Sequence, residues 1–165
     1  GKMLENVWGG KRFLIYYMFT GLGAAALHLG VSQYEILSLQ SQLNPSDVNI
    51  LLENGKNVLE GNQNYSNQMM GKLNLLINTP TVGASGAVFG ILLAFGMLFP
   101  NTLLYIYFAI PVKAKYFVMV YGALELYLGL SNNPADNVAH FAHLGGMLFG
   151  FLLLKYWQKE RNTFY

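Results

Sequence analysis

Four stretches of the 165-residue chain are almost continuously apolar, and more polar segments separate them. They cover residues 13–31, 83–99, 116–130 and 138–157. A helix needs about 20 apolar residues, with a range of about 17–25, to cross the hydrocarbon core of a bilayer. The stretches meet or nearly meet this length, so the pattern predicts four membrane-spanning helices.

Residues 102–112, between the second and third stretches, are apolar and aromatic but too short to cross a bilayer. Aromatic side chains are common at the headgroup level of a membrane. We therefore expect an interfacial or re-entrant segment here.

The segment 32–82 is the one long polar stretch, and apolar residues recur within it at helical spacing. One such run extends from Val48 to Leu59, with Ser46 or Asp47 as the expected helix cap. A second run covers residues 67–78. We expect a long helical loop, either a surface hairpin or, as the sharper alternative, an element that admits or gates a ligand.

Composition also favours a membrane protein. Hydrophobic residues make up 53% of the chain and charged residues 11%, whereas about a quarter of an average soluble domain is charged. The net charge of +2 argues against nucleic acid as a partner. The absence of cysteine excludes disulfides and thiolate chemistry, and we expect neither a metal nor an organic cofactor.

The expected fold class is an all-α polytopic transmembrane helix bundle, forming a single membrane domain over residues 1–165 in the lipid bilayer. The opening residues, GKMLENVWGG, include neither an initiator methionine nor a signal peptide. We therefore expect the domain to be truncated at its N-terminus.

Basic residues are distributed unequally if the four spans alternate in direction. One side then receives Lys2, Lys11, Arg12, Lys113, Lys115, Lys155, Lys159 and Arg161, and the other side receives Lys56 and Lys72. Because cytoplasmic loops carry the excess of Lys and Arg, we expect a cytoplasmic C-terminus and an extracytoplasmic loop 32–82. The expected location is a bacterial inner (plasma) membrane.

Polar residues inside the spans are candidates for chemistry, because a polar side chain in a membrane needs a partner or a purpose. Ser85 begins the second span, and taken alone it suits helix packing, since Gly86 and Gly90 form a small-xxx-small pair. His143 lies near the start of the fourth span. A lone histidine at such a place is commonly an interfacial or hydrogen-bonded packing residue.

Depth in the membrane links Ser85 with His143. Ser85 lies about three residues into its span and His143 about six, so a rise of about 1.5 Å per residue puts them within roughly 5 Å of the same depth. A second small-xxx-small pair, Gly146 and Gly150, favours close approach of the two helices. A hydroxyl–imidazole hydrogen bond of about 2.6–3.2 Å would activate the serine, so a Ser–His dyad is the economical hypothesis.

No acidic residue completes a triad in this interpretation. Glu125 lies within the third span, and we expect a structural carboxyl that is hydrogen-bonded to tyrosines or helix ends. His140 lies one helical turn from His143, where it could tune the site electrostatically or be an interfacial histidine.

Two motifs, in this order and separation, resemble the rhomboid family of intramembrane serine proteases. GASG at residues 83–86 is similar to the Gly-x-Ser-Gly motif that begins the fourth of six core helices in that family. AHLGGMLFG at 142–150 is similar to the Ala-His-x-x-Gly-x-x-x-Gly pattern of the sixth helix. MLENVWGGKRFL at 3–14 resembles the junction of the second and third helices, so the resemblance covers about residues 3–157.

The resemblance implies peptide-bond hydrolysis through an acyl-enzyme, with transmembrane proteins as substrates. Ser85 is then the nucleophile and His143 the general base. The expected support comes from Gly83, the Ser85 backbone, His140 and Phe89, whose ring would pack on the imidazole.

Rhomboids also carry a first helix, a loop and a second helix whose His and Asn side chains help to stabilise the oxyanion, and the resemblance does not extend to these elements. Loss of one such donor typically costs about 10²–10³-fold in rate, so we expect this chain alone to be impaired or inactive. Two alternatives are a non-catalytic relative that binds and escorts membrane proteins, and a transporter fragment with Ser85, His143 and Glu125 in a polar pathway.

Overall fold

A computed structural model of the chain describes residues 1–80, 83–106, 109–131 and 139–162. The chain forms two compact units. One comprises residues 1–28 and 83–165, and the other comprises residues 29–82. The mostly helical fold expected from the sequence is confirmed.

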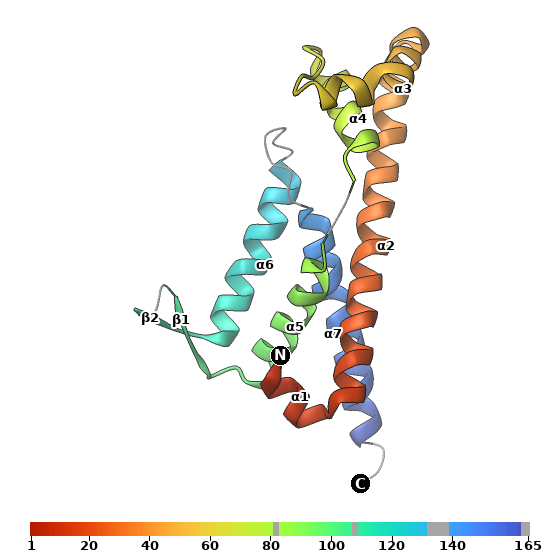
Figure 1. Ribbon diagram of the computed structural model, residues 1–165. Coiled ribbons are helices and arrows are strands. Elements are labelled where there is room, and N and C mark those ends of the chain that lie inside the picture. Colours follow the sequence, from red (N-terminus) through yellow and green to blue (C-terminus); the bar gives the residue numbers. More distant parts are fainter. Residues whose placement is uncertain (81–82, 107–108, 132–138, 163–165) are drawn as a thin grey trace. The chain divides into compact units, whose positions relative to one another are not determined.

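Helices make up most of the first unit (Figure 1). They are α1 (Lys2–Trp8), the first part of α2 (Gly10–Gln42), α5 (Ser85–Leu98), α6 (Ala114–Ser131) and α7 (His140–Asn162). Helices α5 and α7 have the most extensive contact, and α6 packs against both of them. Three helices that follow one another in the sequence therefore pack together.

Aromatic residues close one end of this unit. Helix α1 ends at Trp8 and is followed by Gly9, whose positive φ of 76° lets the chain turn and begin α2 at Gly10. This turn places Trp8 against Tyr16 and Trp157, with ring centroids 4.9 and 5.5 Å away. Leu4 and Tyr16 are fully buried in the resulting core, so the short α1 is anchored by packing.

Glycines determine how closely α5 and α7 approach. A Cβ added at Gly86 would lie 2.8 Å from the Ala142 carbonyl oxygen, and one added at Gly90 would lie 3.0 Å from the Gly146 carbonyl oxygen. A Cβ at Gly146 would collide with the backbone of Gly86. The two helices thus touch through their main chains, which is the packing that small residues permit.

The segment between α5 and α6 forms a hairpin of two short antiparallel strands, β1 (Leu103–Ile106) and β2 (Ile110–Lys113). Leu103 pairs with Lys113, and Ile106 pairs with Ile110. Strands are not among the elements expected from the sequence in this segment. β-Branched and aromatic residues in this segment favour the extended backbone.

The second unit contains the end of α2, followed by α3 (Pro45–Glu60) and α4 (Gln68–Asn78). Both helices predicted within residues 32–82 are confirmed, and they pack against each other with Leu51 and Leu73 fully buried. Lys72 of α4 forms an ion pair of 3.4 Å with Glu35 of α2.

The expected cap of α3, Ser46 or Asp47, is wrong. The helix begins at Pro45 with Asn44 at its N-cap, because proline at the first helical position needs no N–H partner and has a preset φ. The buried Asn74 of α4 donates from Nδ2 to the Gly55 carbonyl oxygen of α3 at 3.1 Å. This hydrogen bond crosses the interface between α3 and α4.

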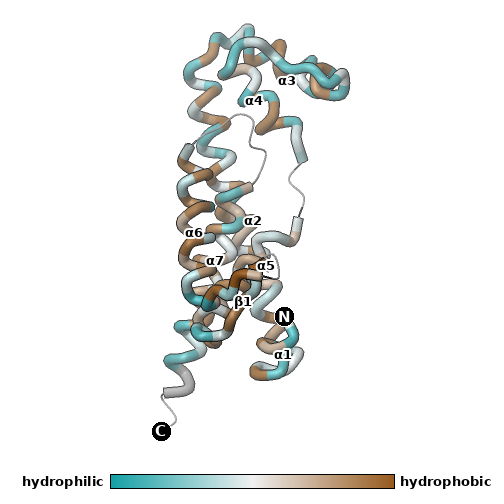
Figure 2. Tube along the Cα trace, turned by 90° about the vertical axis from the view of Figure 1, so that its left-hand side faces the viewer, coloured by the Kyte–Doolittle hydropathy of each residue, from teal (hydrophilic) through white to brown (hydrophobic). Residues whose placement is uncertain are grey.

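Helices lie at all four predicted spans, but the first does not end near residue 31. Helix α2 continues to Gln42, because neither glycine nor proline follows Val31 until Pro45. Among the described residues, α2 alone is both long and apolar enough to cross a membrane, and α5 is apolar but shorter. Figure 2 shows apolar residues recurring along α5, α6 and α7. The count of four crossings stays a prediction.

Candidate functional site

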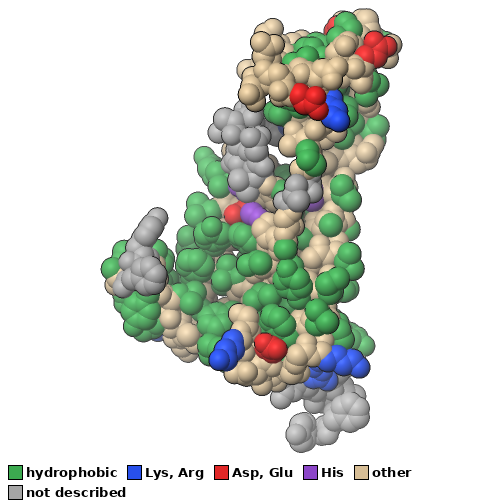
Figure 3. Space-filling model, viewed as in Figure 1, with side chains coloured by type: hydrophobic (Ala, Val, Ile, Leu, Met, Phe, Trp, Pro, Cys, Tyr) green, Lys and Arg blue, Asp and Glu red, His purple; other side chains and the backbone are tan. Residues whose placement is uncertain are grey.

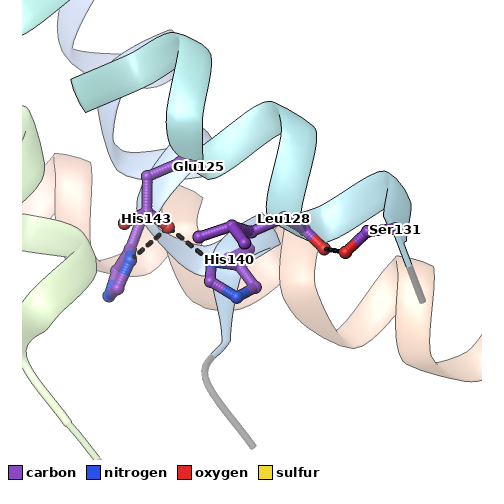
Figure 4. Close-up of polar contacts among 5 residues, drawn as sticks. All are labelled: Glu125, Leu128, Ser131, His140 and His143. Atoms are coloured by element: carbon purple, nitrogen blue, oxygen red, sulfur yellow. Dashed lines mark hydrogen bonds and ion pairs between the residues drawn. The ribbon is translucent and has the colours of Figure 1, made fainter. Parts of the chain in front are cut away.

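Two buried histidines of the first unit contact the same oxygen of a buried glutamate (Figure 4). Oε2 of Glu125, on α6, lies 2.7 Å from Nδ1 of His140 and 2.8 Å from Nδ1 of His143, both on α7. The three residues are only 7%, 7% and 8% exposed. We call Glu125, His140 and His143 the carboxylate–histidine cluster.

Helix geometry explains how the sequence builds this cluster. His140 and His143 are three residues apart in the first turns of α7, so their side chains share one face of the helix. Helix α6 packs on α7 and presents Glu125 to that face. A carboxylate in apolar surroundings needs hydrogen-bond donors, and the two imidazole nitrogens lie where they can supply them.

The expectation that Glu125 bonds to tyrosines or helix ends is wrong, since its described partners are two histidines. The same contact brings an acidic side chain to His143, which the Ser–His dyad hypothesis did not include. The sequence held a partial signal, since one carboxylate and two histidines within apolar stretches can satisfy one another, but it does not show which face of α6 meets α7.

Hydrogen bonding at Nδ1 assigns different tasks to the two nitrogens of His143. With Glu125 ionised, its carboxylate only accepts hydrogen bonds, and the Nδ1–H of His143 then donates to it. In the neutral imidazole, Nε2 then carries the lone pair. This tautomer is the one in which Nε2 can accept a proton.

An aromatic ring covers the face of the same imidazole. The Phe89 and His143 rings stack with centroids 4.0 Å apart and planes at 8°. Phe89 lies on α5 one turn after Ser85, and the Tyr121 ring of α6 lies 5.4 Å from Phe89. His143 is therefore held between side chains of α5 and α6.

Ser85 is exposed and occupies the first position of α5, preceded by Gly83, whose φ of 143° disfavours a side chain. The described residues contain no hydrogen bond between the Ser85 hydroxyl and His143. The structure thus packs α5, which carries Ser85, against α7, which carries His143, but it does not show a contact between these two side chains. The first N–H groups of α5 are free of intrahelical partners, and the ladder begins with Val88 N–H donating to the Ala84 carbonyl oxygen.

Two further glycines of the predicted site lie where α2 meets α5 and α7. Tyr16 donates its hydroxyl hydrogen to the Gly90 carbonyl oxygen at 2.9 Å. A Cβ at Gly150 would meet the Tyr16 ring, with Cζ at 3.2 Å. These positions support helix packing rather than the polar cluster.

The carboxylate–histidine cluster also has the composition of a metal site, since its three possible ligand atoms lie within 4.8 Å of one another. Two histidines and one glutamate are a known ligand set for zinc, with bonds of about 2.0–2.2 Å that put neighbouring ligands of a tetrahedral ion roughly 3.3 Å apart. The observed separations of 2.7 and 2.8 Å are shorter and match hydrogen bonds. The arrangement therefore fits a hydrogen-bonded cluster better than an ion.

Comparisons with known proteins give one family. A family model described as "Rhomboid domain" matches residues 1–159. An uncharacterized mitochondrial rhomboid protein of Schizosaccharomyces pombe is 38% identical over 88 residues, which cover 50% of this chain and 22% of that protein. The chain thus corresponds to a minor part of this relative. No solved structure matches.

Proposed function

Because the chain belongs to the rhomboid family, we propose that it forms part of an intramembrane serine endopeptidase in which Ser85 is the nucleophile and His143 the general base. The observation that carries the proposal is the way in which His143 is held in place. Its Nδ1 bonds to Glu125, its ring stacks on Phe89, and its helix touches the helix of Ser85 through glycines.

In the proposed reaction, Nε2 of His143 takes the Ser85 proton as Oγ attacks the carbonyl carbon of a substrate peptide bond. The bond to the leaving amine breaks, and His143 returns the proton to that amine. Water then attacks the acyl-enzyme while His143 takes its proton, and His143 returns this proton to Ser85 Oγ as the second product leaves with a free carboxyl group. The Ser85 hydroxyl approaches Nε2 to about 2.6–3.2 Å for the first transfer.

The start of α5 suits the negative charge that develops on the substrate oxygen. The free N–H groups of a first helical turn point toward such an oxygen, and the helix dipole favours negative charge there. The backbone N–H of Ser85 is the donor proposed for the oxyanion, and Gly83, with a positive φ of 143°, leads into this turn.

Membership of the rhomboid family indicates an integral membrane protein. Hydrophobic side chains gather over α6 on the face shown in Figure 3, and exposed ones on this helix include Tyr116, Met119, Val120, Leu124 and Tyr127. The proposed substrates are transmembrane proteins, and the proposed orientation places the Lys- and Arg-rich C-terminus in the cytoplasm or its equivalent. The mitochondrial relative does not support the bacterial membrane expected from the sequence.

Covalent labelling of the full-length protein in lipid by a fluorophosphonate tests the proposal. We expect labelling of the wild type and its loss in Ser85→Ala and His143→Ala. A matched control is Ser131→Ala, because Ser131 is exposed and, within the described residues, donates to the Leu128 carbonyl oxygen of its own helix at 2.8 Å. Equal labelling of wild type and Ser85→Ala would refute the assignment of Ser85, and an unlabelled wild type would favour an escort or transport role.

A further inference from the structure

We infer that Glu125 is the positioning residue for His143, so that the proposed dyad works as a chain of hydroxyl, imidazole and carboxylate. This inference rests on the proposed function. It starts from the 2.8 Å contact between Glu125 Oε2 and His143 Nδ1, whose side chains are only 9% and 11% exposed.

The first argument concerns the tautomer of His143. If Nδ1 carried the lone pair, it would face a carboxylate oxygen 2.8 Å away, and two acceptors would oppose each other. Donation from Nδ1–H removes this repulsion and leaves the lone pair on Nε2. The carboxylate therefore selects the tautomer that can take the proton of Ser85.

The second argument concerns orientation. Stacking on Phe89 fixes the plane of the imidazole, and the hydrogen bond to Glu125 fixes its rotation within that plane. A base held in this way needs little reorganisation before the proton transfer.

The third argument concerns charge. Once His143 accepts the Ser85 proton it becomes an imidazolium, and the Glu125 carboxylate lies 2.8 Å from its Nδ1. An opposite charge at this distance in a buried, apolar setting stabilises the protonated ring more than it would in water. The same contact that orients the base thus stabilises the charge that develops on it.

His140 has a different part in this arrangement. Its Nδ1 lies 2.7 Å from the same Oε2, so it holds the carboxylate from the second side. His140 acts through Glu125, and its loss is expected to have a smaller effect than the loss of the carboxylate.

The rate of fluorophosphonate labelling of the full-length protein in lipid tests the inference, together with ¹⁵N NMR of its histidines. In Glu125→Gln an amide N–H can face Nδ1 and stabilise the opposite tautomer, so we expect labelling to be slowed about 10²-fold or more. Glu125→Asp keeps the charge and should be slowed less. Glu60→Gln is the matched control, since Glu60 is exposed and its ion pair in the described part of the chain is with Lys56 of the same helix, at 3.9 Å.

The NMR signature separates positioning from a structural role. We expect the wild-type His143 to be protonated at Nδ1 and not at Nε2, and Glu125→Gln to reverse this, with the His143 signals assigned by their absence in His143→Ala. A wild-type His143 that carries its proton on Nε2 would overturn the inference even if Glu125→Gln does not fold.

Three other outcomes are also decisive. If Ser85→Ala abolishes labelling while a folded Glu125→Gln labels at the wild-type rate, the inference fails and the proposed protease stands. If Ser85→Ala labels like the wild type, the protease fails first and the inference falls with it. If EDTA abolishes wild-type labelling and zinc restores it, the carboxylate–histidine cluster is a metal site and Glu125 is a ligand instead.

Discussion

The ring of Phe89 lies parallel to the imidazole of His143, with centroids 4.0 Å apart. Phe89 lies on α5 and His143 on α7, and the rest of α5, the hairpin and all of α6 lie between them in the sequence. Since Phe89 is one helical turn from Ser85, the stack links the face of α5 that carries the proposed nucleophile to the proposed base.

We expect Phe89→Leu to slow fluorophosphonate labelling about 2–10-fold, because an aromatic stack contributes about 0.5–1.5 kcal/mol beyond the burial of its area. Leucine keeps the site apolar but gives the imidazole no flat surface. Phe151→Leu on α7 is the control, because that side chain is 41% exposed and lies outside the site. Equal rates in the two variants would contradict a role for the stack.

We expect Gly146→Ala to lower the thermal unfolding midpoint of the purified protein, because overpacking lowers the free energy of unfolding by about 1–3 kcal/mol. The added methyl group would collide with the Gly86 backbone, which cannot rotate away as a side chain could. Gly30→Ala is the matched control, since nothing lies within 4 Å of its Cβ position and alanine favours the helix. A midpoint unchanged by Gly146→Ala would show that α5 and α7 are not in main-chain contact.

We expect Tyr16→Phe to destabilise the first unit by about 0.5–1.5 kcal/mol, the usual contribution of a hydrogen bond. The lost bond joins the Tyr16 hydroxyl to the Gly90 carbonyl oxygen over 2.9 Å in a fully buried position. Tyr34→Phe should have no effect, because Tyr34 is 75% exposed. Chemical denaturation of the protein in detergent would measure both changes.

We expect Asn74→Ala to raise the rate of amide hydrogen exchange in α3 and α4, because it lowers the free energy of unfolding of these helices by about 1–3 kcal/mol. The substitution removes a fully buried side chain whose Nδ2 bonds to the Gly55 carbonyl oxygen and to Asn64 Oδ1. Asn54→Ala, at an exposed position of α3, should change the exchange little. Labelling of Ser85 should be unaffected, because Ser85 and Asn74 belong to different units; a parallel loss of labelling would contradict this independence.

The pattern of apolar residues predicts the positions of the helices well, because the apolar stretches are long and polar segments separate them clearly. The start of α5 next to Ser85 and its end before Pro100 follow from local residues. The hairpin at Leu103–Lys113 could not be foreseen from length alone, since a short apolar run suits a strand and an interfacial helix equally. The extension of α2 to Gln42 shows that loss of hydrophobicity is not a helix stop.

The candidate site divides in a similar way. Ser85 and His143 stand out in the sequence because motif spacing and depth can be counted along single helices. The partner of His143 depends on which face of α6 packs against α7, and a span with apolar residues on every side carries no such information. The sequence therefore marks Glu125 as a polar residue within a span but does not identify its neighbours.

The contact between Gly86 and Gly146 also determines which substitutions can change the distance between α5 and α7. Atoms of the main chain, rather than rotatable side chains, define how far the turn of Ser85 lies from the turn of His143. Lipid-facing residues can consequently drift in size and shape during evolution without altering that spacing. A single methyl group at the seam between the two helices is enough to change it.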